Sequence, residues 1–290
     1  MTIVFIAALL MLFIAHGAPT LAHWRDFSWL RAWQEKVGRQ GGDVFGLLLC
    51  IGTPALACAL VQVALHGKLL VLFALAFATA MLFYCWGPGD LERDVEAIDK
   101  APDSDRRVAA AQALRGDEVQ QPLAFECAAL VEATFTAGLR RWFGVLFWFA
   151  VLGPAGALLY RMTQLLAFGQ AYAEGLSASQ RGLVERCARI LDWLPAHLMA
   201  LSLALASNFD AVFKTWHEYH AANGKGYFSL DIGFLGAIAR ASVVADVAAE
   251  GEQAGRNPLV ALDDAMVLVR RVLVVWLTIM AVIVLAGWLA

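Results

Sequence analysis

Long uncharged stretches alternate with polar segments along the chain. Because a hydrocarbon core of about 30 Å needs about 20 apolar residues in a helix, such stretches can cross a membrane. Four stretches qualify, at residues 45–65, 69–86, 142–160 and 272–290. Only His66, Gly67 and Lys68 separate the first two, which predicts a transmembrane hairpin over 45–86. The pattern therefore predicts a multi-pass membrane protein.

Two further stretches are marginal as membrane spans. Residues 1–24 carry no charge but are interrupted by His16, Gly17 and Pro19, and residues 194–209 are short for a span. Since no Lys or Arg precedes the first apolar stretch, we interpret it as a retained segment rather than a secretory signal. Each of the two can cross the bilayer or lie only partly in it.

The polar segments show helical rather than strand periodicity. Leu91, Val95 and Ile98 recur at helical spacing, and Ser177 or Ser179 can begin a helix with one apolar face, suited to the membrane interface. The sequence thus predicts an all-α, multi-pass integral membrane protein with cytoplasmic and interfacial amphipathic helices. The expected segments are an N-terminal apolar segment with a basic linker (1–44), the transmembrane hairpin (45–86), a cytoplasmic helical segment (87–141), a central core with transmembrane or re-entrant helices (142–209), a second cytoplasmic helical segment (210–271) and a C-terminal transmembrane helix (272–290).

Basic residues in the short flanking loops predict the orientation in the membrane. Arg25, Arg31, Lys36 and Arg39 precede the hairpin, whereas only Lys68 lies in its turn. Because Lys and Arg are enriched in cytoplasmic loops, the turn is expected outside and the segment 87–141 inside. The C-terminus is then expected outside, and the expected location is a bacterial inner membrane.

Composition narrows the classes of function. With 60% apolar and 16% charged residues, the chain does not resemble an ordinary soluble protein. It has 22 Lys and Arg against 25 Asp and Glu, a net charge of −3, so it has no basic excess with which to bind nucleic acid. The five cysteines lie mostly in apolar stretches without metal-ligand spacing, which is typical of small core residues.

Motifs of nucleotide binding and nucleophilic catalysis are absent from the sequence. It contains neither a G-x-x-x-x-G-K-[ST] run nor a G-x-S-x-G elbow. His217 and His220 share one helical face and could hold a metal, but no nearby residues complete a ligand set, and an exposed or interfacial pair is the simpler interpretation. The sequence therefore predicts no catalytic residue, no metal and no cofactor.

Arg161 directly follows the apolar run 142–160, and Asp192 interrupts the apolar run from Ile190 to Pro195. A charge at membrane depth is costly unless it is paired or faces water, so both are candidates for one functional polar site. The alternative is structural: Arg161 extends to the lipid headgroups, and Asp192 caps a turn before Pro195.

Three runs carry a resemblance to a known superfamily: Phe147-Trp148, the run Gly153-Pro154-Ala155-Gly156-Ala157-Leu158-Leu159-Tyr160-Arg161, and the run Leu191-Asp192-Trp193-Leu194-Pro195-Ala196-His197-Leu198. They resemble the central signature of the superfamily that joins AmpE to CobD/CbiB, over roughly residues 118–206. AmpE proteins are inner-membrane proteins associated with regulation of β-lactamase induction. CobD/CbiB proteins are adenosylcobinamide-phosphate synthases, which form an amide bond with an aminopropanol-type amine and use ATP and magnesium.

The presence or absence of carboxylates at the positions of the synthase pattern distinguishes a CobD/CbiB-like chain from an AmpE-like one. Where the synthase pattern has acidic or amide residues, this chain has Thr136, Ala137, Arg140 and Ala167, and only Glu132 remains of the acidic row. A magnesium-nucleotide reaction needs hard oxygen ligands, so the resemblance implies a scaffold that has lost the synthase reaction. The departures favour an AmpE-like protein that is not an enzyme.

The resemblance implies a regulatory or sensory inner-membrane protein linked to cell-envelope stress, β-lactamase induction and antibiotic resistance. Its partners would be the lipid bilayer, a small-molecule ligand, a protein of envelope signalling and a second copy of the chain. The alternatives are an adenosylcobinamide-phosphate synthase-like amide ligase of the cobalamin pathway and a structural scaffold. The expected polar cavity is formed by Glu132, Arg140, Tyr160, Arg161, Gln164 and Asp192.

Overall fold

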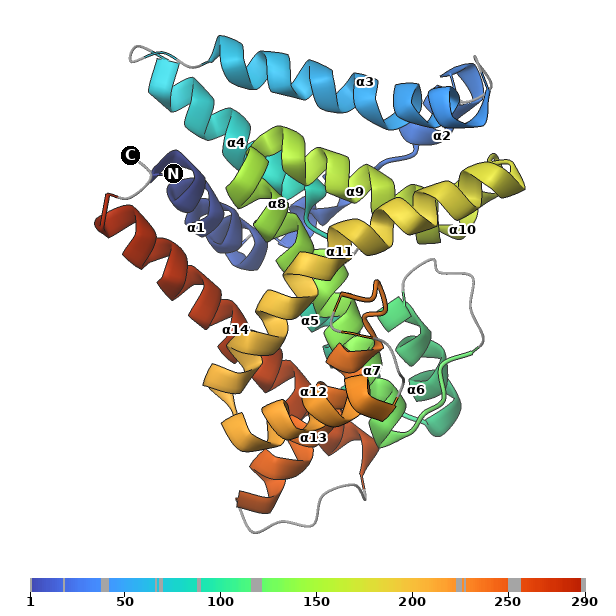
Figure 1. The fold of residues 1–290 in the computed structure, drawn as a ribbon, viewed down its shortest axis with the longest axis vertical. Helices are drawn as coiled ribbons and strands as arrows, with labels where there is room; N and C mark the ends of the chain where they lie inside the picture. The colour runs from blue at the N-terminus through green and yellow to red at the C-terminus, as the bar shows by residue number, and fades with distance from the viewer. Residues whose placement is uncertain are drawn as a thin grey trace.

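The fold is all-helical in the computed structural model, as the sequence predicts (Figure 1). The structure describes residues 2–17, 19–37, 42–65, 67, 70–87, 90–115, 122–222, 226, 228–249 and 257–287. Arg39 and Lys68, which contribute to the predicted orientation, lie outside these residues.

The helices follow one another in the order α1 (Thr2–Gly17), η1 (Pro19–Trp24), α2 (Trp29–Val37), α3 (Asp43–Ala64), α4 (Val71–Cys85), α5 (Leu91–Asp99), α6 (Ser104–Ala111), η3 (Gln112–Arg115), α7 (Cys127–Gly138), η4 (Leu139–Phe143), α8 (Gly144–Leu152), α9 (Pro154–Phe168), α10 (Gln170–Ala173), α11 (Ala178–Ala206), α12 (Phe209–Ala222), α13 (Gly233–Ala249) and α14 (Pro258–Leu285).

Four helices in the described part of the chain are long and apolar enough to cross a membrane. They are Asp43–Ala64, Cys127–Leu152, Ala178–Ala206 and Pro258–Leu285, and the shorter α1 and α4 are also apolar. Large apolar side chains remain exposed on these helices, among them Leu60 of α3 and Val282 of α14. Exposure of such apolar surfaces to water is unfavourable, whereas their contact with lipid chains is not. The chain is therefore a multi-pass membrane protein.

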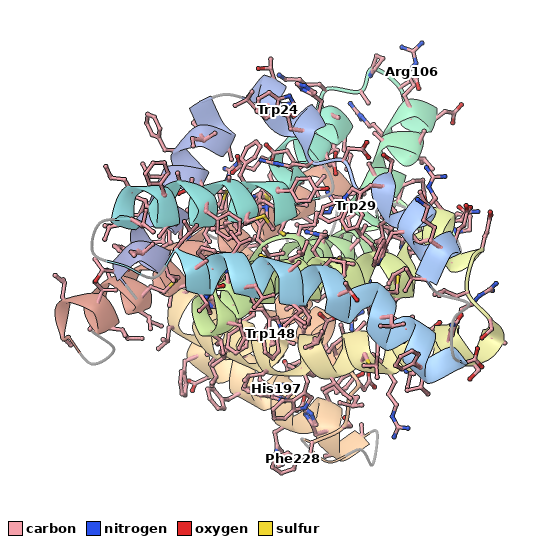
Figure 2. The ribbon with its side chains drawn as sticks, turned by 90° about the horizontal axis from the view of Figure 1, so that it is seen from above. Trp24, Trp29, Arg106, Trp148, His197 and Phe228 are labelled. Carbon is pink, nitrogen blue, oxygen red and sulfur yellow. The ribbon has the colours of Figure 1, made fainter. Side chains whose placement is uncertain are left out.

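The continuous helix α7–η4–α8 is central to the arrangement (Figure 1). Helix α7 packs against α13 and α14, and α8 forms an antiparallel hairpin with α9. Helix α3 lies across α9 at the top of the molecule, and Figure 2 shows it from above. Helices α6, α12 and α13 lie in the half of the molecule opposite α3 (Figure 1).

The uncharged stretch 142–160 is not one membrane helix, which corrects the boundary expected from hydropathy. Helix α8 ends at Leu152, Gly153 has a φ of +71°, and Pro154 begins α9. Glycine adopts positive φ easily, and proline suits the first turn of a helix, so this pair forms a sharp reversal. The long helix instead continues backwards to Cys127, through two arginines that the hydropathy pattern excluded.

The stretch 194–209 is likewise part of a longer element, since helix α11 runs from Ala178 to Ala206. It begins at the predicted Ser177, whose side chain and that of Gln180 form a reciprocal capping box. Asp192 therefore lies within this helix rather than at its start, and the expected capping role of Asp192 is wrong.

A hydrogen bond repairs helix α11 where proline interrupts it. Pro195 has no N–H, so the carbonyl of Leu191, four residues earlier, lacks its usual donor. The indole Nε1 of Trp148 donates to that carbonyl at 3.1 Å. Two of the runs that carry the superfamily resemblance are thus joined by one contact.

Trp148→Phe is expected to lower the free energy of unfolding by about 1–3 kcal/mol, the range for a buried polar group left unpaired. In a Pro195→Ala background the restored N–H supplies the donor, so the same change should be less destabilising. Thermal unfolding of the four proteins in detergent measures this coupling. Equal losses in both backgrounds would show that Trp148 acts through packing alone.

The orientation remains a prediction that labelling can test. Arg106 is exposed on α6, at the end opposite the marked C-terminus in Figure 1, and Figure 2 labels it at the edge of the molecule. In spheroplasts, Arg106→Cys should resist a membrane-impermeant maleimide, while a C-terminal cysteine tag should react. Labelling of Arg106→Cys from the periplasm would invert the orientation that the basic loops predict.

Candidate functional site

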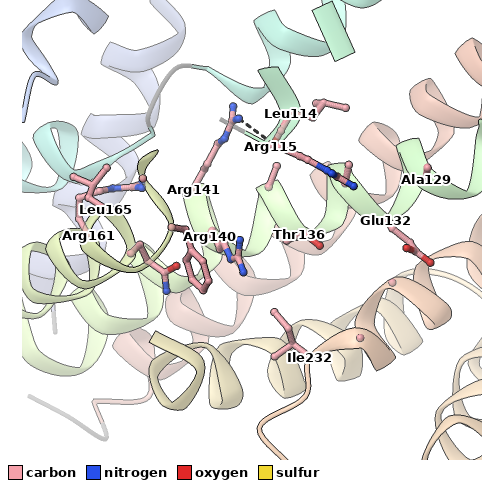
Figure 3. A pocket seen from close by; sticks show the side chains of 17 residues that line it. Leu114, Arg115, Ala129, Glu132, Thr136, Arg140, Arg141, Arg161, Leu165 and Ile232 are labelled. Atoms are coloured by element: carbon pink, nitrogen blue, oxygen red, sulfur yellow. Dashed lines mark hydrogen bonds between the residues drawn. The ribbon is translucent and has the colours of Figure 1, made fainter. Parts of the chain in front are cut away.

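A cavity of about 340 Å³ lies among α7, η3, η4, α9 and the start of α13 (Figure 3). Its size is at the lower end of the range of about 300–1,000 Å³ for small-molecule sites. Four arginines and a single carboxylate line it, so its wall is strongly basic. We name it the arginine pocket; its polar lining residues are Arg115, Glu132, Thr136, Arg140, Arg141, Arg161 and Gln164.

A π-helical turn presents two of these arginines. Over Leu139–Phe143 the helix widens, and the N–H of Gly144 bonds the carbonyl of Leu139, five residues back. Such turns are rare and occur frequently at functional sites. Arg140 and Arg141 lie within this turn, and both line the pocket.

Asp192 organises one side of the pocket from behind its wall. Its carboxylate is fully buried and accepts hydrogen bonds from the Tyr160 hydroxyl at 2.6 Å and from Nε2 of Gln164 at 2.7 Å. Nε of Arg140 lies 3.6 Å from its second oxygen. Arg140 also stacks over the ring of Phe168, with Cζ 3.9 Å from the centroid. Asp192 therefore holds Arg140 and Gln164 in place.

Tyr160 reaches Asp192 because Gly144 leaves room for it. A Cβ at Gly144 would lie 2.1 Å from the Tyr160 hydroxyl oxygen, far inside van der Waals contact. The glycine at the end of the π-helical turn thus admits the phenol that donates to the buried carboxylate.

Unlike Arg140 and Arg141, Arg161 forms no ion pair with a carboxylate among the described residues. It is 3% exposed, and its Nε donates to the main-chain carbonyl of Cys85 at 2.8 Å. Its Nη2 has no hydrogen-bond partner among the described residues. A buried cation without a counter-charge is costly, and an anion in the pocket would offset that cost.

Arg161 also borders a second, smaller cavity of about 170 Å³, which Arg25 lines from the loop after η1. Burial lowers the pKa of Arg25 and raises the pKa of Asp90, because it disfavours the charged form of each. The charge of Asp90 partly offsets the effect of burial on Arg25.

Arg141 and Glu132, which also line the arginine pocket, each form an ion pair. Arg141 pairs with Asp94 of α5 and donates to the carbonyls of Ala113 and Leu114, which ties η3 to η4. Glu132 pairs with Arg240 of α13. These contacts fix the position of the helices around the cavity.

The structure brings the six residues of the expected polar cavity together, although not all of them reach its surface. Glu132, Arg140, Arg161 and Gln164 line the arginine pocket, while Tyr160 and Asp192 lie in the hydrogen-bond network behind it. The ion partner of Asp192 is Arg140, whereas the sequence suggested Arg161. The alternative in which Arg161 extends to lipid headgroups is also wrong, because its side chain is buried.

Sequence reasoning missed Arg115 as a pocket residue and Asp94 as the partner of Arg141. Neither residue belongs to a recognisable motif. Both lie in short polar helices, distant in sequence from most of the other residues of the pocket. The tandem Arg140-Arg141 at the edge of an apolar run is a usable signal, because two adjacent charges there need partners.

The superfamily resemblance implies a magnesium ion. The side chains that line the arginine pocket do not fit one. Magnesium needs several hard oxygen ligands. Glu132 is paired with Arg240, and Asp192 is occupied by Tyr160, Gln164 and Arg140. The described residues contain no group of three or more His, Cys, Asp or Glu side chains suited to a metal.

Two comparisons with known proteins agree on a family. A family profile described as CobD/Cbib protein matches residues 5–231. Over 175 residues the chain is 26% identical to a protein of Chromobacterium violaceum named "Cobalamin biosynthesis protein CobD"; the match covers 58% of this chain and 56% of that protein. The chain thus spans only a little over half the length of this curated relative. No solved structure matches.

These matches contradict the expectation of an AmpE-type regulator of β-lactamase induction, because the family and the named relative are both CobD. The expectation failed because it judged the branch from missing carboxylates. Three of the four substituted positions, Thr136, Ala137 and Arg140, do line the arginine pocket. These substitutions change the charge of the pocket, but they do not identify the family. With the profile matching most of its length, the chain belongs to the CobD/CbiB family.

Proposed function

We propose that this chain acts in cobalamin biosynthesis, at the step that joins a corrinoid acid and an aminopropanol-type amine by an amide bond. The arginine pocket would bind the anionic part of a reactant. The observation that carries the proposal is the buried, carboxylate-free guanidinium of Arg161 in a basic pocket within the segment that matches the family.

The location of the pocket supports a role in substrate binding. Its arginines come from η3, η4 and α9, all within residues 5–231, and only the start of α13 contributes from outside that match. Tyr160 and Gln164 both donate hydrogen bonds to the buried carboxylate of Asp192, which restricts the side chain of Gln164 to one arrangement. This network would therefore present Gln164, and Arg140 beside it, preorganised to a ligand.

In this proposal the arginines supply the charge neutralisation that a metal would otherwise give. Guanidinium groups bind carboxylate and phosphate oxygens in a fixed, bidentate geometry and stay charged at all relevant pH values. A small pocket of this kind would orient the anionic end of a reactant and leave the reacting end at its opening. No step of the reaction is assigned to Glu132, which serves Arg240.

Complementation tests this function. In a bacterium that lacks its own amide-forming enzyme, the wild-type chain should restore growth that depends on cobalamin made from the corrinoid acid. Arg161→Gln should fail, whereas Arg189→Gln, a change at an exposed arginine of α11, should succeed. Failure of the wild type, present in the membrane at normal levels, would contradict the function. Growth with Arg161→Gln would show that the function does not depend on Arg161 in the arginine pocket.

A further inference from the structure

The second cavity, of about 170 Å³, contains two arginines and has no part in the proposed function. We name it the small cavity; Arg25, Tyr84, Trp86 and Arg161 are among its lining residues. It lies between the loop after η1, the end of α4, and helices α9 and α10. Arg161 and Leu165, one turn apart on α9, line both the small cavity and the arginine pocket (Figure 3). The two cavities are thus neighbours that share one guanidinium.

Each arginine of the small cavity has a buried nitrogen without a hydrogen-bond partner among the described residues, namely Nε of Arg25 and Nη2 of Arg161. The Arg161 side chain is 3% exposed. Its Nε donates to the carbonyl of Cys85, and the two residues that flank Cys85, Tyr84 and Trp86, line the small cavity. The Arg161 guanidinium therefore lies against this cavity. Buried donors without a partner are uncommon and call for a specific cause.

The carboxylates near the small cavity are directed elsewhere. Asp26 accepts hydrogen bonds on both oxygens from the N–H and the hydroxyl of Ser28. Asp90 offsets part of the burial cost of Arg25, but its side chain accepts from the N–H of Glu92 at the start of α5. Two cations that share a small, partly buried space repel each other, and water solvates them without neutralising them. A bound anion would remove the repulsion and satisfy both donors.

The walls of the small cavity favour one class of anion. The Tyr84 hydroxyl is already engaged, since it donates to the carbonyl of Asp26 and accepts from the indole of Trp29, both at 2.6 Å. The two guanidiniums then supply the charged donors, and the rings of Phe27 and Trp86 supply apolar wall. A phosphate or sulfate would leave several oxygens without donors there, which is costly. A halide has no fixed acceptor directions and tolerates contact with ring edges, which carry partial positive charge.

We propose that the small cavity binds a single monovalent anion of the halide class, chloride in the cell, between Nε of Arg25 and Nη2 of Arg161. The ion would tie the loop after η1 to α9 and hold Arg161 in the wall between the two cavities. This inference does not rest on the proposed function, because it concerns a different cavity and needs no reaction.

Thermal unfolding of the full-length protein in detergent tests the site. Sodium bromide is titrated against sodium gluconate at constant ionic strength, gluconate being too bulky for the cavity. Bromide should raise the Tm in a saturable manner, because it binds the folded state alone. Arg25→Gln should weaken bromide binding about 10- to 100-fold, the range that loss of a charge-assisted hydrogen bond gives. The matched control Arg31→Gln, at an exposed arginine of α2, should leave it unchanged.

Anomalous scattering from crystals grown in bromide locates the ion, and a peak between Arg25 and Arg161 is expected. A bromide effect that survives Arg25→Gln and is lost in Arg140→Gln would place the ion in the arginine pocket and overturn the inference. A folded wild-type protein with the same Tm in bromide and in gluconate would also overturn it, and that result needs no variant. Either outcome leaves the proposed function standing, because complementation tests that function separately.

Discussion

Asp192→Ala should be among the most destabilising single changes in this protein, lowering the free energy of unfolding in detergent by about 3–5 kcal/mol. The carboxylate is fully buried and accepts hydrogen bonds from Tyr160 and Gln164 while facing Arg140. Its removal leaves a guanidinium, a phenol and an amide without their acceptor. Denaturant or thermal unfolding of the two proteins measures the loss.

A double-mutant cycle identifies the partner. Arg140→Gln combined with Asp192→Ala should cost clearly less than the sum of the single changes, because one group is no longer left alone when both are removed. The cycle of Arg161→Gln with Asp192→Ala should show weaker coupling, since Arg161 bonds the carbonyl of Cys85 instead. Stronger coupling to Arg161 than to Arg140 would contradict the contacts that the structure shows.

Gly144→Ala should disturb the same network from the other side. The new methyl group would overlap the Tyr160 ring and hydroxyl, at 2.1–2.6 Å from the nearest atoms. Overpacking of a dense core typically costs about 1–3 kcal/mol. Displacement of Tyr160 also breaks its bond to Asp192, and a buried hydroxyl without a partner adds about 1–3 kcal/mol. The loss in unfolding free energy should therefore approach that of Asp192→Ala.

Gly182→Ala is the matched control, because a Cβ at that position of α11 meets nothing within 4 Å. Since alanine favours helix more than glycine does, this change should be neutral or slightly stabilising. A Gly144→Ala protein as stable as the Gly182→Ala protein would show that the close packing of Tyr160 on Gly144 does not exist.

Hydropathy predicted those helices whose membrane-facing sides are uncharged, and it failed where charges are paired inside the protein. Helices α3 and α4 correspond to predicted apolar stretches, and so does the second half of α14, which begins at Pro258 rather than at the predicted residue 272. The span Cys127–Leu152 was missed because it contains Arg140 and Arg141, whose partners Asp94 and Asp192 lie on other helices. A hydropathy window counts the charge of an arginine but does not include the carboxylate that pairs with it from another helix. The limits of this membrane span therefore depend on tertiary ion pairs that hydropathy does not register.

The site was predictable as a set of residues but not as a set of contacts. The expense of a charge at membrane depth singled out Arg161 and Asp192, and both belong to the pocket or its supporting network. Their pairing was wrong because the reversal at Gly153 turns α9 so that Tyr160 and Gln164, rather than Arg161, reach Asp192. No sequence spacing reports which side of a helix meets which neighbour across such a turn.

Formation of the amide product tests the central claim most directly. Purified protein in detergent is given the corrinoid acid, an aminopropanol-type amine and ATP, and the product is followed by mass spectrometry. The account predicts product with the wild type and with Arg189→Gln, and none above background with folded Arg161→Gln. A folded wild-type protein that makes no product, or an Arg161→Gln protein that makes as much as the wild type, would contradict it.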